Sequence, residues 1–96
     1  ADRLGKIFRH ELSLFAEDNK WIKKVRGKGL LNAILINDTE DSTTAWDICI
    51  KLRDNGLLAK PTHGNIIRFA PPLVMTENEL LDCISIIKKT ILDFKK

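Results

Sequence analysis

The length and composition of the chain limit what it can be. It has 96 residues, of which 44% are hydrophobic and 30% charged, and its formal net charge is +3. We expect one domain, residues 1–96, because separate hydrophobic cores become usual only beyond roughly 250 residues. The composition is that of a globular domain and excludes a collagen-like or disordered chain. The longest uncharged apolar run, residues 29–37, is too short to cross a bilayer, so we expect no membrane partner.

The N-terminal segment has the periodicity of a helix. Apolar residues recur at three- and four-residue steps within residues 4–15, which predicts a helix with one buried face. The sequence begins inside this pattern and does not have the composition of a signal peptide. We therefore expect a domain cut from a larger protein, with any targeting segment outside the chain.

A cluster of basic residues follows this helix. Five cations fall within nine positions: Lys20, Lys23, Lys24, Arg26 and Lys28. Clustered cations can bind phosphate groups, but here only Trp21 interleaves with them, whereas proteins that bind single strands stack bases on several aromatic rings. We interpret the cluster as a solvated edge that leads into a strand, and we expect no nucleic acid partner.

The middle of the chain predicts a strand and then a helix. Residues 30–36 are apolar on both faces, which is typical of a strand that is covered on both sides or central to its sheet. Gly27 and Gly29 leave room there for a bend or a close backbone approach. Helical spacing returns at residues 45–52 and ends at Asn55 and Gly56, and Gly56 suits the left-handed position after a helix.

The C-terminal part predicts two short strands and a last helix. The strands are expected at residues 57–60 and 66–70, with a turn at 61–65, and Pro71 and Pro72 end the second strand because proline lacks an amide donor. Thr76 and Glu79 have the spacing of a capping box before an apolar stripe that runs to residue 94. The whole order predicts an α+β fold, a small two-layer sandwich of three helices against a short, mostly antiparallel sheet.

The cysteines, histidines and carboxylates form no evident reactive group. Cys49 and Cys83 lie on the apolar stripes of predicted helices and have no CxxC spacing, which indicates buried, reduced thiols of an intracellular protein. His10 is expected on an exposed helix face and His63 in a loop, so neither a metal site nor a nucleophile-base pair is predicted. Five carboxylates are expected on helix surfaces or at caps: Asp47, Asp54, Glu77, Glu79 and Asp82.

One arginine interrupts an apolar strand. Arg68 stands between Ile67 and Phe69, and its guanidinium either faces water or a structural ion-pair partner, or binds a carboxylate through two parallel hydrogen bonds. The spacing leaves both interpretations open. The preceding loop, residues 60–64, lacks the glycine spacing of a P-loop and is interpreted as a turn.

Three strings carry a family resemblance: RGKGLLNAILI at residues 26–36, DICIKLRDNGLLAKPTHGNIIRFAPPL at 47–73 and TENEL at 76–80. In this order they resemble the C-terminal region of class III aminotransferases. The fuller strings LRDNGLLAKPTHG and IIRFAPPL are similar to the ornithine-specific members, and acetylornithine and 4-aminobutyrate aminotransferases are the nearest alternatives. Asn65 replaces the acidic residue typical of that loop, and we interpret this change as surface variation.

The resemblance implies a C-terminal small domain of a fold-type I enzyme that uses pyridoxal 5'-phosphate (PLP) and works as a homodimer. The large domain, outside this chain, would bind PLP and supply the catalytic residues. The complete enzyme would transfer the δ-amino group of ornithine to 2-oxoglutarate, giving glutamate-5-semialdehyde and glutamate, in the cytoplasm or the mitochondrial matrix. Arg68 would bind a substrate carboxylate, and would pair with a glutamate elsewhere in the enzyme when ornithine is bound. A stand-alone α/β binding module that uses the basic cluster is the alternative from another class.

Overall fold

The computed structural model describes residues 2–28, 31–39, 41–62, 65–69 and 76–95. Its elements follow the order α1 (Asp2–Glu17), β1 (Ile22–Lys28), β2 (Leu31–Ile36), α2 (Thr44–Asp54), β3 (Lys60–Thr62), β4 (Ile66–Phe69) and α3 (Glu77–Asp93). The strands form one sheet in the order β1-β2-β4-β3, and each neighbouring pair is antiparallel. The predicted α+β class and the antiparallel sheet are confirmed.

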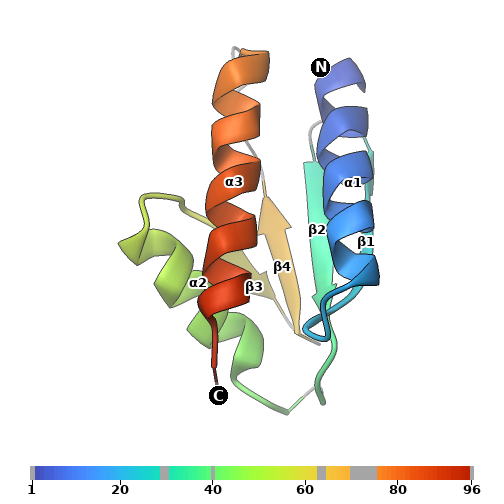
Figure 1. Cartoon of the computed structure of the whole chain (residues 1–96). Helices are drawn as coiled ribbons and strands as arrows, with labels where there is room; N and C mark the ends of the chain where they lie inside the picture. The colour runs from blue at the N-terminus through green and yellow to red at the C-terminus, as the bar shows by residue number, and fades with distance from the viewer. Residues whose placement is uncertain (1, 29–30, 40, 63–64, 70–75, 96) are drawn as a thin grey trace.

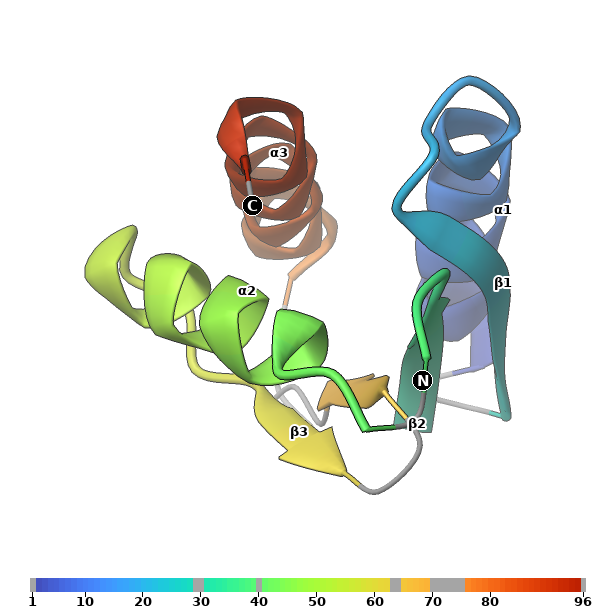
Figure 2. The same cartoon turned by 90° about the horizontal axis from the view of Figure 1, so that it is seen from below.

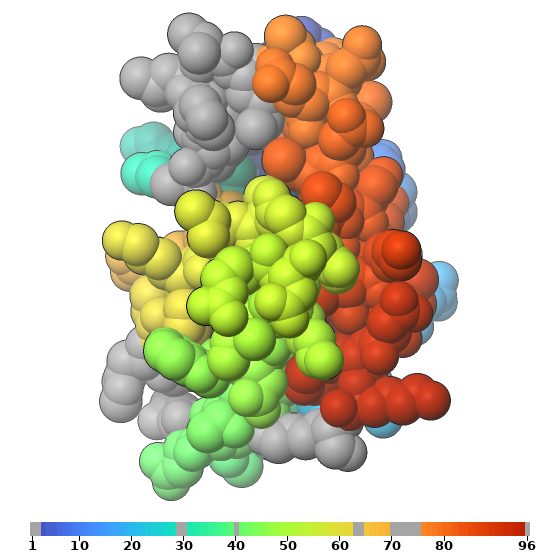
Figure 3. Space-filling view, turned by 90° about the vertical axis from the view of Figure 1, so that its left-hand side faces the viewer, coloured from blue at the N-terminus to red at the C-terminus, as the bar shows by residue number. Residues whose placement is uncertain are grey.

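The molecule has two layers. Helices α1, α2 and α3 all lie on the same side of the sheet (Figures 1 and 2). Helix α1 contacts β1 and β2, α2 contacts β3 and β4, and α3 contacts both other helices. Figure 3 shows α2 directly against α3, with β3 beside them. The other face of the sheet has no helix of the described chain over it, so it is the open face.

The core lies between these two layers. Ile34 of β2 and Ile67 of β4 are opposite each other in the register, and both are 0% exposed. Phe8 of α1 packs on Phe69 of β4, with ring centroids 5.5 Å apart. Because side chains alternate along a strand, the neighbours of these buried residues point to the open face.

The ends of α2 and α3 are fixed as the sequence predicts. The Thr76 side chain accepts a hydrogen bond from the Glu79 amide at 3.2 Å, and the Glu79 carboxylate accepts one from the Thr76 amide at 3.0 Å, so the capping box is present. Gly56 follows α2 with φ +95°, in the left-handed region. Asn55 donates from its amide to Thr90 Oγ1 at 2.7 Å, which ties the end of α2 to α3.

Two strands differ from the prediction. The basic segment does not simply precede a strand, because most of it forms β1, an edge strand of the sheet. In β1 Ile22 is buried and most other side chains are exposed. Lysines on an edge strand discourage pairing with other chains. The third strand covers Lys60–Thr62 rather than residues 57–60, and Leu58 is 81% exposed. Pro61 is tolerated there because β3 forms the other edge of the sheet.

The interpretation of Asn65 as a surface change is wrong. Asn65 is only 3% exposed and has φ +60°, a conformation that asparagine adopts more readily than most residues. Its side-chain amide donates to Ser42 Oγ at 2.7 Å and to the Thr39 carbonyl, and its side-chain oxygen accepts from the Ala45 amide at 3.0 Å. The side chain therefore joins the start of β4 to the segment before α2.

Some of the predicted features lie outside the described residues. These are Gly29, His63, Gly64, Pro71 and Pro72.

Candidate functional site

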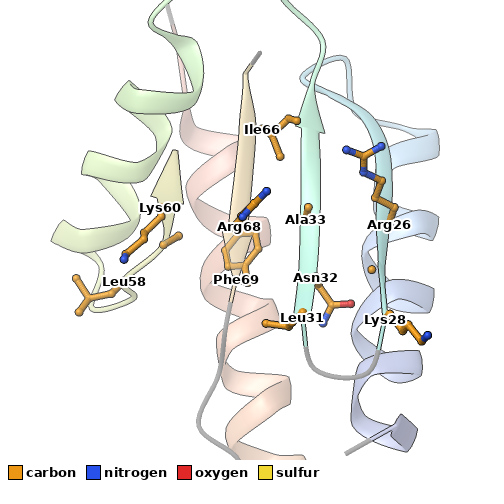
Figure 4. A pocket seen from close by; sticks show the side chains of 12 residues that line it. Arg26, Lys28, Leu31, Asn32, Ala33, Leu58, Lys60, Ile66, Arg68 and Phe69 are labelled. Carbon is orange, nitrogen blue, oxygen red and sulfur yellow. The ribbon is translucent and has the colours of Figure 1, made fainter. Parts of the chain in front are cut away.

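A groove of about 940 Å³ lies on the open face of the sheet, and residues from the four strands line it (Figure 4). Among the described residues that line it, four are cations and none is an aspartate or glutamate. The other lining residues are apolar, small or amide side chains. The cations are Arg26, Lys28, Lys60 and Arg68.

Three of these cations share one row across the sheet. In the strand register Lys60 is opposite Arg68, Arg68 is opposite Ala33, and Ala33 is opposite Arg26. Directly paired residues point to the same face, and neighbouring strands are about 4.8 Å apart. Like charges directly opposite each other are unfavourable, so this row favours an anion in the groove.

Arg68 lines the groove from β4, between Lys60 of β3 and Ala33 of β2 in the register. Its neighbours Ile67 and Phe69 are buried under the helices, so the strand alternation directs Arg68 to the open face, where it is exposed. Among the described residues no carboxylate pairs with it, so the interpretation of Arg68 as half of a structural ion pair finds no partner there. An unpaired guanidinium in a groove can bind a carboxylate through two parallel hydrogen bonds.

The structure does not place the whole basic cluster in the groove. Arg26 and Lys28 line the groove, whereas Lys23 and Lys24 lie over a smaller hollow beside α1. Lys20 Nζ lies 5.1 Å from the centroid of the Trp21 ring, which packs edge-on against Phe94 at 5.1 Å between ring centroids. Trp21 thus belongs to the core margin, and the cluster does not act as a single basic patch.

The cysteines and His10 lie outside the groove. Burial raises the pKa of the Cys49 thiol to about 11. Cys83 is half-buried rather than fully buried as predicted, and its pKa is raised by burial first and then by the charges of Asp82 and Glu79. His10 is exposed, as predicted. Within the described part of the chain no group of three or more His, Cys, Asp or Glu residues could hold a metal ion.

The predicted surface carboxylates have structural partners or face solvent. Glu77 pairs with Arg3, and the Thr43 hydroxyl donates to Asp47 at 3.1 Å. Asp54 and Asp82 are exposed on their helices. None of the five predicted carboxylates lines the groove.

The described lysines do not suit a covalently bound aldehyde cofactor. Such a cofactor needs an enclosed amine, because burial is what makes a lysine nucleophilic. Among the lysines whose side chains the structure describes, all are exposed except Lys88, which is half-buried and pairs with Glu11 at 3.3 Å. These lysines therefore do not fit the covalent site of such a cofactor.

The association of Arg26 and Lys60 with Arg68 is not predicted from the sequence. Lys60 is only eight positions from Arg68, but Arg26 is far from both, and the strand register brings it into the same row. The alternation of Lys24, Arg26 and Lys28 with Val25 and Gly27 was a period-two signal that could have indicated a strand.

Comparison with known proteins identifies the family of this chain. The family model described as aminotransferase class-III matches residues 1–91. The mitochondrial ornithine aminotransferase of Rattus norvegicus is 57% identical over 94 residues, which are 98% of this chain and 21% of that protein. The chain thus spans about a fifth of the length of this relative.

Solved structures agree with this match. The acetylornithine aminotransferase of Elizabethkingia anophelis has a TM-score of 0.94 and 67% identity, over 97% of this chain and 23% of that one. An ornithine aminotransferase of Plasmodium yoelii has a TM-score of 0.87 and 40% identity, over 98% of this chain and 24% of that one. In the described residues no helix is long and apolar enough to span a membrane. By sequence and by structure, the chain belongs to the class-III aminotransferase family.

Proposed function

We propose that this chain is the C-terminal small domain of an ornithine aminotransferase. The complete enzyme would transfer the δ-amino group of ornithine to 2-oxoglutarate, and Arg68 would bind a substrate carboxylate. The observation that carries this proposal is the exposed Arg68 guanidinium, which lies in an open groove whose described lining residues include other cations and no carboxylate. The names of the Rattus norvegicus and Plasmodium yoelii relatives support the substrate assignment.

The cofactor is held elsewhere in this proposal. Class-III aminotransferases depend on PLP, which accepts the electrons of the bond that breaks when an amino group moves. The described lysines suit no such site, so we assign PLP and the catalytic residues to the large domain. We also propose that the enzyme is a homodimer in the cytoplasm or the mitochondrial matrix, the latter being the location in the name of the Rattus norvegicus relative.

The part played by this chain is to bind and orient the substrate. The Arg68 fork would hold a carboxylate in one plane. The same pocket must also accept ornithine, which presents its terminal amine where glutamate presents a carboxylate. A glutamate of the large domain that pairs with Arg68 when ornithine is bound would allow this exchange.

A second candidate substrate is N-acetylornithine. It is favoured by the 67% identity to the Elizabethkingia anophelis structure, which is named an acetylornithine aminotransferase. Both substrates present the same δ-amine and α-carboxylate. They differ at the α-nitrogen, which is a cation in ornithine and a neutral amide in N-acetylornithine.

The test is a comparison of amino donors with the full-length enzyme loaded with PLP. Ornithine, N-acetylornithine and 4-aminobutyrate are each supplied with 2-oxoglutarate, and kcat/KM is measured. We expect ornithine to exceed the other two by at least about tenfold, since a pocket that is arranged for a charged group discriminates against a neutral analogue. A preference for N-acetylornithine or 4-aminobutyrate would replace the proposed substrate, and no transfer from any donor would overturn the proposal.

A further inference from the structure

We propose that Arg26 is a second cation of the carboxylate site and makes it selective for dicarboxylates. This inference rests on the proposed function and goes beyond it, because it assigns a specificity role to a residue on a different strand. Arg26 is exposed on the edge strand β1 and lines the groove together with Arg68. Two strands away from β4, it reaches the site from the opposite side.

Ala33 creates the space between the two guanidinium groups. It lies on β2 and is paired directly with Arg26 on one side and with Arg68 on the other. Two strand spacings place the α-carbons of the two arginines on the order of 10 Å apart. In Figure 4 both long side chains lean toward β2 from the flanking strands, with the short side chain of Ala33 between them. A guanidinium group therefore lies on each side of the space above Ala33.

The charges of the alternating substrates explain what a second cation would do. Arg68 would hold the carboxylate on the reacting carbon of 2-oxoglutarate or glutamate, and the opposite end of these substrates is a second carboxylate. The corresponding end of ornithine carries a carboxylate together with an ammonium group. The positive charge of Arg26 attracts the lone carboxylate. In ornithine its attraction for the carboxylate is nearly cancelled by its repulsion of the neighbouring ammonium group. Arg26 should thus strengthen the binding of dicarboxylates and contribute little to the binding of ornithine.

A solvated edge residue would also be exposed, so the inference needs a matched comparison. Lys24 provides it, because it lies on the same strand, carries the same charge and is exposed, but does not line the groove. Among the described residues neither Arg26 nor Lys24 takes part in an ion pair. Equal effects of Arg26→Gln and Lys24→Gln would reflect net charge alone, while a difference between them reflects position.

The experiment measures inhibition of the full-length enzyme by two unreactive probes of equal chain length. Glutarate has two carboxylates and pentanoate has one. For Arg26→Gln we expect the inhibition constant of glutarate and the KM for 2-oxoglutarate to rise about 3- to 10-fold. The inhibition constant of pentanoate and the KM for ornithine should stay unchanged. Arg26→Lys should retain most of the selectivity, and Lys24→Gln all of it. The difference in glutarate inhibition between the original enzyme and Arg26→Gln should shrink as the salt concentration rises, because exposed charges are screened.

Each outcome bears on the inference separately from the proposed function. Equal glutarate inhibition in Arg26→Gln and Lys24→Gln, with Arg68→Gln strongly impaired, would overturn the role of Arg26 and leave the proposed function intact. An active enzyme in which Arg68→Gln is harmless would remove the carboxylate site itself. If Arg26→Gln does not fold, Ala33→Leu fills the same space without changing a charge. Ala33→Leu should weaken inhibition by glutarate and leave inhibition by pentanoate unchanged. Unchanged inhibition by glutarate would again overturn the inference.

Discussion

The side-chain oxygen of Asn65 accepts a hydrogen bond from the backbone amide of Ala45 at 3.0 Å, although the two residues are 20 positions apart. This bond occupies a free amide at the start of α2, where Thr43 makes no side-chain capping bond. Asn65→Ala should destabilise this region by about 2 to 4 kcal/mol, since it leaves buried polar groups without partners and puts alanine at a positive φ.

Hydrogen-deuterium exchange of residues 44–48 in the full-length protein measures that loss. Asn65→Asp is the matched control. A carboxylate still accepts from Ala45 but cannot donate to the Thr39 carbonyl, so its exchange should accelerate less. Unchanged exchange in Asn65→Ala would contradict the role of Asn65 as a remote cap.

Gly27 allows β1 and β2 to approach closely, as its position before the predicted strand suggested. A Cβ at this position would fall 2.8 Å from the α-carbon of Asn32 and 2.5 Å from its side-chain oxygen. That oxygen already accepts a hydrogen bond from Arg9 at 2.7 Å. Gly27→Ala should therefore cost about 1 to 3 kcal/mol, because backbone atoms must shift to relieve the contact.

The measurement is amide exchange in β1 and β2, with Lys24→Ala as the control on the same strand. Exchange should accelerate in Gly27→Ala and stay near the original rate in the control, whose side chain is exposed. Equal rates in the two variants would mean that the strands tolerate a methyl group at this position.

The Cys49 thiol should be almost inert. With its pKa raised to about 11 from an ordinary 9.0, the thiolate fraction at pH 8 falls about a hundredfold. Iodoacetamide at pH 8 should therefore label the half-buried Cys83 before Cys49 in the folded full-length protein, as followed by peptide mass spectrometry. Faster labelling of Cys49 would show that α2 opens or that the thiol is not buried.

The capping box predicts a pH dependence at the start of α3. Hydrogen bonds from the backbone and then the side chain of Thr76 lower the pKa of Glu79 from its ordinary 4.5. A lowered pKa means that the contribution is fully present above the ordinary pKa and is lost as the pH falls through the lowered one. The Thr76→Ala variant keeps the backbone amide and removes only the side-chain contribution, so the Glu79 pKa, followed by NMR of labelled carboxyl carbons, should rise part of the way to its ordinary value. An unchanged pKa would mean that the capping box does not form in solution.

The sequence was sufficient for elements with strong local signals. The period of α1 and α3, the capping box at Thr76 and the stop at Gly56 depend only on neighbours along the chain. Arg68 was identified from its place in an apolar strand, and its exposure followed from the alternation in β4.

The remaining features depend on distant partners. The edge strand β1 has few apolar residues, so its charges looked like solvated surface, and its backbone partner in β2 decides its conformation. The role of Asn65 is not evident from its neighbours in the sequence, because the three hydrogen-bond partners of its side chain are more than 19 positions away. The row formed by Arg26, Ala33 and Arg68 also required the register of the sheet.

The most direct test of the carboxylate site compares the two half-reactions of the full-length enzyme in single turnovers, with and without the guanidinium of Arg68. Arg68→Gln removes two charge-assisted hydrogen bonds, so we expect a loss of about 2 to 4 kcal/mol, or about 30- to 1000-fold, in the glutamate half-reaction. The ornithine half-reaction should lose less, because the arginine is then paired with a glutamate. Arg68→Lys should recover only part of the loss, since an ammonium group keeps the charge without the fork. Equal losses in both half-reactions, or no loss in either, would contradict the account and make Arg68 a structural residue.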